Sequence, residues 1–252
     1  MSGELLCIGI GAGDPDWITV EAIAAIRRID VLFVVVKSDG PDELVEARRA
    51  LIERYREQPV RTVELPDPPR PWRTAADYAA AVRRWRAERS DQWGEAISRE
   101  LGETRTGGFL VWGDPSLFES TLAILQSLGT AVAAPRPVRV IPGVSCVHAL
   151  TARHGVSLNR PGRAVQIMPA RLLGERLPPG VDDVVVMLDA NLAFATLAAE
   201  GIDIYWGAYL GTPDEILVAG SLADVRDEIV ALRAEAIGRK GWVFDTYLLR
   251  RR

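Results

Sequence analysis

The sequence predicts an α/β fold built around a parallel sheet, and three observations lead to this prediction. Short apolar runs alternate along the chain with segments of helical periodicity. Residues 31–36 are continuously apolar and rich in valine, which is typical of a strand covered on both faces of a parallel sheet. Glycine-bearing loops follow three of the predicted strands, at the edge where an open parallel sheet binds its ligands.

In the first half of the chain, each predicted element follows from its local pattern. Apolar runs that end at glycine, proline or polar residues predict strands at 5–10, 31–36, 60–65, 109–112 and 138–141. Amphipathic spacing and N-cap residues predict helices at 20–28 after Thr19, 42–55, 74–101, 117–128 and 145–153. Pro66 and the three prolines that follow it by residue 71 are predicted to prevent regular structure.

The second half continues the α/β alternation with a different arrangement of strands. Strands are predicted at 184–188, 202–208, 216–219 and 242–249, and helices at 192–199 and 222–236. Because some of the last strands follow one another without a helix between them, we expect antiparallel pairing there. The domain boundary is placed at Pro142, which gives an N-terminal α/β domain of residues 1–142 and a C-terminal α/β domain of residues 143–252.

Composition and charge exclude several classes of protein. With 252 residues and a formal net charge of −4, the chain has no electrostatic footprint for nucleic acid. Its basic residues are almost all arginines, a bias that arises from genome composition or from a carboxylate-rich ligand. Cys7 and Cys146 lie in apolar runs as expected of buried thiols, and no metal-ligand spacing is present, so no metal is expected.

Neither a signal peptide nor a membrane span is expected. The first residues lead directly into a predicted strand, without a basic region and an apolar segment. No apolar run approaches the roughly 20 residues that a transmembrane helix requires. We therefore expect a cytoplasmic protein that does not contact the membrane.

The first glycine loop does not fit a dinucleotide site. Gly9, Gly11 and Gly13 follow the first strand, but Asp14 stands where the third glycine of the G-x-G-x-x-G pattern would be. Residues 15–18 then separate the glycines from the next helix, so a pyrophosphate would have no helix N-terminus beneath it. A tight turn without a ligand is the alternative for this loop taken alone.

Two more loops have the same character. Residues 112–118 read Trp-Gly-Asp-Pro-Ser-Leu-Phe and follow the fourth strand, and residues 141–146 read Ile-Pro-Gly-Val-Ser-Cys and follow the fifth. Each loop alone is compatible with turn chemistry. Three such loops at the carboxyl ends of parallel strands together indicate a small-molecule site.

These loops, in this order, resemble those of the tetrapyrrole methylase family, and the resemblance covers essentially the whole chain. Residues 8–15 read Ile-Gly-Ile-Gly-Ala-Gly-Asp-Pro, and the Gly113-Asp114-Pro115 and Pro142–Ser145 loops match later family motifs. Residues 185–188 and the Leu210-Gly211-Thr212 loop match motifs of the second half. Ala12 stands where proline is usual, and Trp112 stands where a glycine often precedes the Gly-Asp-Pro motif.

The resemblance implies a two-domain fold of the class III methyltransferases that use S-adenosylmethionine (SAM), with the cofactor in the cleft between the domains. Residues 110–117, 186–189, 206–211 and 241–250 resemble one subgroup, which methylates a cobalamin precursor at ring carbon C1 and releases an acetyl group as acetate. The implied partner is a small-molecule tetrapyrrole, and a homodimer is expected. The product of the cofactor would be S-adenosylhomocysteine (SAH).

On the same resemblance, cofactor-binding residues are expected in five loops. They are Gly11, Ala12, Gly113, Asp114, Leu117, Ser145, Cys146, Leu188, Leu210 and Gly211. Asp114 is the carboxylate expected nearest the cofactor, and its alternative role is to cap the loop before Pro115.

The base that deacetylation requires is left open by the sequence. Asp14, Asp16, Asp114 and His148 are the candidates, with structural roles as the alternative for each. Arg70, Arg73 and Arg160 lie in proline-bearing segments and are candidates for binding the tetrapyrrole carboxylates, or are ordinary surface residues.

Three other functions compete with this interpretation. A different member of the family would methylate another ring position or a protein side chain. A non-catalytic nucleotide-binding or regulatory protein could keep the same fold. A dehydrogenase is disfavoured by the first glycine loop, and binding of SAM against NADH distinguishes these classes.

Overall fold

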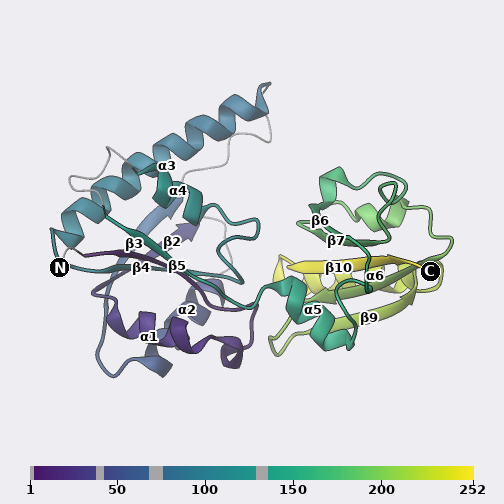
Figure 1. Cartoon of the computed structure of the whole chain (residues 1–252), viewed down its shortest axis with the longest axis horizontal. Helices are drawn as coiled ribbons and strands as arrows, with labels where there is room; N and C mark the ends of the chain where they lie inside the picture. The colour runs from purple at the N-terminus through teal and green to yellow at the C-terminus, as the bar shows by residue number, and fades with distance from the viewer. Residues whose placement is uncertain (1–2, 38–42, 68–75, 129–135) are drawn as a thin grey trace. The chain divides into compact units, whose positions relative to one another are not determined.

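The computed structural model describes residues 3–37, 43–67, 76–128 and 136–252, which form two compact units (Figure 1). The first unit comprises residues 1–11 and 15–144, and the second comprises residues 12–14 and 145–252. Each unit contains a five-stranded sheet within the described residues. The α/β class that the sequence predicts is confirmed.

The sheet of the first unit is parallel throughout and has the strand order β3-β2-β4-β1-β5. Its strands are β1 (Leu5–Gly9), β2 (Val31–Lys37), β3 (Arg61–Asp67), β4 (Gly107–Val111) and β5 (Val138–Ile141). β1, β2 and β4 are almost wholly apolar because both faces of the sheet are covered. β1 lies between β4 and β5, so the carboxyl ends of these three strands are neighbours.

Helices cover both faces of this sheet, as Figure 1 shows. The helices are α1 (Val20–Arg28), α2 (Glu43–Tyr55), α3 (Tyr78–Leu101) and α4 (Thr121–Ser127). Ile26 and Ile52 of the first two helices pack with Ile8 on one face. Trp93 and Ile124 of the other two pack with Cys7 on the opposite face. The Thr19 side chain accepts a hydrogen bond from the Ala22 amide and caps α1, as predicted.

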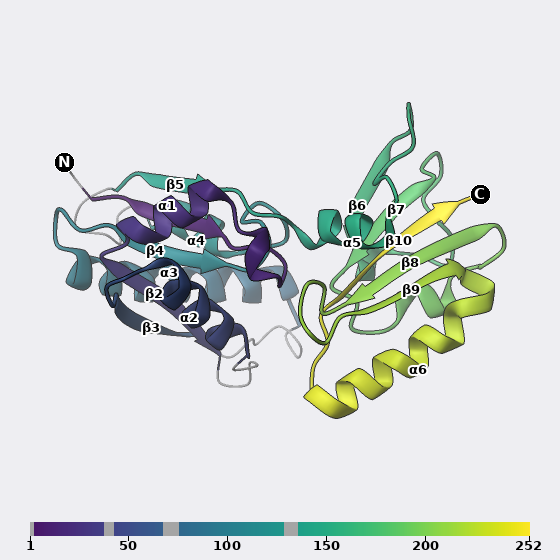
Figure 2. The same ribbon diagram turned by 90° about the horizontal axis from the view of Figure 1, so that it is seen from below.

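The second unit contains a mixed sheet with the order β6-β7-β10-β8-β9 (Figure 2). Its strands are β6 (Val165–Pro169), β7 (Asp183–Met187), β8 (Ile202–Ala208), β9 (Ile216–Ser221) and β10 (Asp245–Arg251). β10 pairs antiparallel with β7 and β8, and β8 pairs antiparallel with β9, which confirms the predicted change in pairing. β7 and β8 therefore run in the same direction and end at the same edge of the sheet.

Two helices pack on opposite faces of this second sheet. Trp206 belongs to the core cluster beneath α6 (Leu222–Lys240). The next residue, Gly207, faces the other way, and a Cβ there would lie 2.9 Å from Leu150 of α5 (Cys146–His154). The glycine allows α5 to approach the sheet closely.

The structure corrects several sequence predictions. β3 continues through Pro66, because β3 is an edge strand and a proline can stand where no partner needs its N–H. The predicted helix at 192–199 is only a 3₁₀ turn, Ala193–Thr196, which follows the left-handed Leu192 and ends at the extended Leu197. The fourth helix begins at Thr121 rather than at residue 117, because residues 112–120 form a loop. β6 was not predicted.

Candidate functional site

The three glycine-bearing loops of the first unit follow neighbouring strands, as the sequence predicts. β4, β1 and β5 run parallel and adjacent, so the loops after Val111, Gly9 and Ile141 leave the sheet at one edge. Gly11 and Gly113 join the first two loops by a pair of backbone hydrogen bonds of 3.3 and 2.7 Å. Three loops that are far apart along the chain therefore lie together in space.

Glycine is required in this cluster because the three loops touch backbone to backbone. A Cβ on Gly143 would lie 2.2 Å from the Gly113 carbonyl oxygen and 2.8 Å from the Gly9 carbonyl carbon. A Cβ on Gly9 would lie 2.5 Å from the Gly143 nitrogen. Real Cβ atoms do not approach backbone this closely, so any side chain at either position would separate the loops.

The Asp114 carboxylate ties two of these loops together. One of its oxygens accepts a hydrogen bond from the Gly143 amide at 2.9 Å. The other accepts from the Ser116 amide at 2.9 Å and also from the Ser116 hydroxyl. This geometry supports the loop-capping role considered for Asp114 and extends it to the next loop.

Leu117 and its neighbour complete the loop after β4. The Leu117 amide donates to the Asp114 carbonyl oxygen at 3.2 Å, which closes a tight turn. Phe118 then has a φ of +52° and is 44 % exposed. A left-handed conformation in a bulky residue is strained, and such strain is concentrated at functional loops.

Two charged residues near this edge were not anticipated from the sequence. β2 pairs with β4 only at residues 31–33, so the Leu110 carbonyl oxygen is left to accept from Arg48 Nε at 2.9 Å. Glu119 accepts from the Ser120 and Thr121 amides and so caps α4. The available signal for Glu119 was an acidic residue in the first turn of the helix predicted at 117–128, whereas Arg48 is placed by tertiary structure alone.

Ser145, Cys146 and His148 lie at the start of α5. Ser145 is buried and its hydroxyl lies 2.9 Å from Nδ1 of the exposed His148 ring. Burial raises the pKa of Cys146 to about 11, and burial together with the nearby Glu119 and Asp114 carboxylates raises that of Cys7 to about 12. Both thiols therefore stay protonated at neutral pH and neither is an activated nucleophile.

Leu188 follows β7 in an unusual conformation. Its φ is +57° and its side chain is 63 % exposed, although it continues a strand of buried valines. The next residue, Asp189, is buried and accepts hydrogen bonds from the Asn191 and Ala193 amides at 3.0 and 2.8 Å. The chain therefore turns sharply and leaves the leucine side chain on the surface.

Leu210 and Gly211 lie in the loop after β8, at the same edge of the second sheet as Leu188. Leu210 is buried, and Gly211 has a φ of +75°, where glycine is favoured. The Gly211 amide donates to the Glu215 carboxylate at 2.7 Å, and Arg153 of α5 pairs with the same carboxylate at 3.0 Å.

Residues 12–14 belong to the second unit and pack against this loop. A Cβ on Gly13 would lie 2.2 Å from the Leu210 carbonyl oxygen, and Ala12 is buried. Asp14 is partly exposed at the end of this segment. Asp16 lies in the short 3₁₀ helix Pro15–Trp17 of the first unit and pairs with Arg54 at 2.5 Å.

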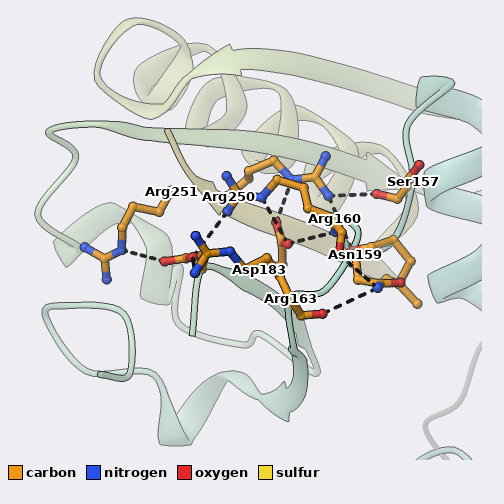
Figure 3. Close-up of polar contacts among 9 residues, drawn as sticks. Ser157, Asn159, Arg160, Arg163, Asp183, Arg250 and Arg251 are labelled. Carbon is orange, nitrogen blue, oxygen red and sulfur yellow. Dashed lines mark hydrogen bonds and ion pairs between the residues drawn. The ribbon is translucent and has the colours of Figure 1, made fainter. Parts of the chain in front are cut away.

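Of the three arginines that are candidates for binding the substrate carboxylates, the structure describes only Arg160. Arg70 and Arg73 lie outside the described residues. Arg160 lies in an ion-pair network around the fully buried Asp183, 3.4 Å from its carboxylate, and Arg250 pairs with the same carboxylate at 2.6 Å (Figure 3). Asp183 begins β7, so this network lies at the edge of the sheet opposite to Leu188 and Leu210.

The described residues contain neither a candidate metal site nor a helix that could span a membrane. No group of three His, Cys, Asp or Glu side chains there could hold a metal ion. None of the helices in the described ranges has the length and apolarity that crossing a bilayer demands.

Comparison with known proteins shows what this architecture is similar to. The family model of the tetrapyrrole (corrin/porphyrin) methylases matches residues 4–226. A precorrin-6A synthase [deacetylating] of Sinorhizobium sp is 42 % identical over 250 residues, covering 98 % of this chain and 95 % of the relative. A cobalt-precorrin-2 C(20)-methyltransferase of Salmonella typhimurium is 28 % identical over 61 % of this chain and 57 % of the relative.

Solved structures agree with these relatives. A cobalamin synthesis related protein (CobF) from Corynebacterium diphtheriae superimposes with a TM-score of 0.85 at 32 % identity, covering 100 % of this chain and 99 % of the other. Uroporphyrin-III C-methyltransferase from Thermus thermophilus, solved with S-adenosyl homocysteine, shares the fold with a TM-score of 0.58 at 16 % identity over 98 % and 92 % of the two chains. From its matched residues and from these identities, the chain belongs to the tetrapyrrole methylase family.

Proposed function

We propose that this chain is a SAM-dependent C-methyltransferase that converts precorrin-5 into precorrin-6A in the aerobic route of cobalamin biosynthesis. The observation that carries the proposal is the 42 % identity, over almost the whole of both chains, to a relative named precorrin-6A synthase [deacetylating]. A cytoplasmic location and a homodimer are part of the proposal; the homodimer rests on the family resemblance alone, and analytical ultracentrifugation tests it.

The proposed cofactor residues are those in the loops of each unit. In the first unit they are Gly11, Gly113, Asp114 and Leu117, and in the second Ala12, Ser145, Cys146, Leu188, Leu210 and Gly211. The loops of the first unit lie at the carboxyl ends of neighbouring parallel strands, where an open parallel sheet binds its ligands. Phe118, Leu188 and Tyr209 in these loops have positive φ values. Such strain supports the assignment of the loops to the cofactor site, because strained conformations are concentrated at functional sites.

The reaction requires the chain to do two things. SAM, when bound, supplies the methyl group as an electrophile. Water adds to the acetyl carbonyl of the substrate, the bond to C1 breaks, acetate leaves, and the electron pair left on C1 takes the methyl group. Positioning and exclusion of bulk water serve the methyl transfer, whereas a base and hydrogen-bond donors serve the deacetylation.

For the base, the proposal favours His148 among the four candidates. When its Nδ1 donates to the Ser145 hydroxyl, Nε2 of this exposed ring carries the lone pair that a base needs. The Asp114 oxygens already accept hydrogen bonds from Ser116 and Gly143, and Asp16 pairs with Arg54. His148→Gln should lower the deacetylation rate by about 10²-fold or more while SAH binding persists. Asp14→Asn is the comparison variant, and a larger loss there would transfer the role to Asp14.

The experiment that tests the proposed function supplies precorrin-5 and SAM labelled with ¹³C in the methyl group. NMR should then detect one acetate per methyl group transferred, with the label on C1. Methylation with the acetyl group retained would refute the deacetylating activity but leave a methyltransferase. Acetate release without SAM would show that hydrolysis is independent of methylation and would refute the linkage of the two steps.

A further inference from the structure

The exposed Leu188 is adjacent to a buried polar network in the second unit. Asp189 is 4 % exposed, and the Tyr247 hydroxyl, itself fully buried on β10, donates to its carboxylate at 2.7 Å. This is the third hydrogen bond to that carboxylate, after those from the Asn191 and Ala193 amides. All of the turn that follows Leu188 is therefore organised around one buried carboxylate.

A buried ion pair is also linked to the backbone of the same turn. Arg233 of α6 donates to the Asp189 carbonyl oxygen. Its Nε also pairs with the Asp245 carboxylate at 2.9 Å, and the Trp206 indole N–H donates to that carboxylate at 3.0 Å. The side chains of Arg233 and Asp245 are 8 % and 3 % exposed. Residues from β8, β10 and α6 thus converge on the turn that follows β7.

Stability alone is a poor explanation for such a network. Buried ion pairs generally stabilise a fold no better than apolar side chains of the same volume. The network surrounds a turn with two strained residues, since both Leu188 and Leu192 have a φ of +57°. Non-glycine residues remain in this region only when their surroundings over-determine the conformation.

We propose that Asp189, Tyr247, Arg233, Asp245 and Trp206 act as positioning residues that hold Leu188 in its left-handed conformation for contact with the cofactor. The inference rests on the proposed function because it assigns Leu188 to the SAM site. It explains why two stretches that resemble the deacetylating subgroup, residues 186–189 and 241–250, meet around the same turn. None of the five residues needs to touch the cofactor.

The test compares two variants that damage opposite edges of the same sheet. Tyr247→Phe removes only the hydroxyl donor to Asp189, and calorimetry should then show SAH binding weakened about tenfold. Arg250→Met is the matched control, because it breaks the buried pair with Asp183 at the other edge (Figure 3). The control should lower the melting temperature at least as much and leave the SAH affinity unchanged.

A double-mutant cycle tests whether the Tyr247 hydroxyl affects SAH binding through Leu188. Leu188→Ala alone should weaken SAH binding, and Tyr247→Phe should then add no further loss in the Leu188→Ala background. Additive losses would overturn the proposal, because the network would then act on binding without Leu188. If Tyr247→Phe folds poorly, Asp189→Asn, which keeps the side-chain shape, takes its place in the cycle.

A measurement without cofactor separates this inference from the proposed function. In Tyr247→Phe the amides of Asn191 and Ala193 should exchange with deuterium faster than in the unmodified chain, while amides of β9 keep their rates. Unchanged exchange at both amides overturns the positioning role. If the unmodified chain binds no SAH and the exchange changes as expected, the proposed function fails and the structural part of the inference stands.

Discussion

Asp114 illustrates how a single residue can have two roles in one site. Its carboxylate accepts hydrogen bonds from Ser116 in its own loop and from the Gly143 amide in the next loop. An asparagine has only one acceptor oxygen, and its NH₂ group would face one of these N–H donors. The residue therefore determines how the second and third glycine loops lie relative to each other.

We predict that Asp114→Asn destabilises the fold and weakens SAH binding together. An unpaired amide at Gly143 or Ser116 costs about 1–3 kcal/mol of unfolding free energy. Urea denaturation and calorimetry measure the two effects on one preparation. Normal SAH affinity in a variant that unfolds at lower urea would restrict Asp114 to holding the loops.

His154 has a structural role. Its Nε2 lies 3.0 Å from the Trp206 carbonyl oxygen and its ring packs edge-on against Tyr205. Burial lowers the pKa of His154, and the Trp206 carbonyl and the Glu215 charge oppose this shift only in part. The folded state therefore favours the neutral ring.

The direction of this shift predicts a loss of stability in mild acid. Because the folded-state pKa is lower than that of the unfolded chain, the unfolded state binds the proton first as the pH falls. The contribution of His154 is complete above about pH 6.5 and decreases as the pH falls through the folded-state pKa. Urea denaturation from pH 8 to pH 5 should show that the advantage of the unmodified chain over His154→Gln shrinks with falling pH. A constant difference would contradict the shift.

At the scale of elements, the parallel order β4-β1-β5 brings the three loops to one edge. The loops meet at Gly9, Gly113 and Gly143, where backbone occupies the space that side chains would otherwise fill. Two kinds of glycine can be distinguished here. Gly143 is required by close approach, whereas Gly155 is favoured by its φ of +64° and has open space around it.

We predict that Gly143→Ala abolishes SAH binding, whereas Gly155→Ala only lowers stability. The alanine methyl at 143 would clash with the Gly113 carbonyl oxygen and force the loops apart, at a cost of about 1–3 kcal/mol or more. At 155 the cost is only the strain of a left-handed alanine, about 1–2 kcal/mol. Calorimetry measures the SAH affinity of both variants. SAH binding by a folded Gly143→Ala variant would show that these loops are not part of the cofactor site.

At the scale of the whole molecule, ligand binding distinguishes the competing classes of protein. SAH at about 100 times its dissociation constant should raise the free energy of unfolding by about 2.7 kcal/mol. NADH at the same concentration should have no effect, because the first loop has no helix directly after its glycines. Denaturation with each ligand measures both effects, and stabilisation by NADH alone would favour a dehydrogenase.

Local patterns in the sequence were enough to predict the α/β class, most strands and the three loops of the first unit. Apolar runs such as residues 31–36 and turn residues such as Pro142 and Gly143 act within a few positions along the chain, so the sequence predicts them. The resemblance of the loops to a known family added the function, and the family is confirmed. The cofactor residues and the base stay predictions.

Tertiary structure alone decided the rest, because it depends on contacts between residues far apart in sequence. The strand order makes Pro66 an edge residue and lets β3 run through it, which the local proline signal does not predict. Arg48 contacts Leu110 across 62 positions, and Tyr247 contacts Asp189 across 58. No spacing in the sequence predicts such pairs, because these contacts form only when the sheet has assembled.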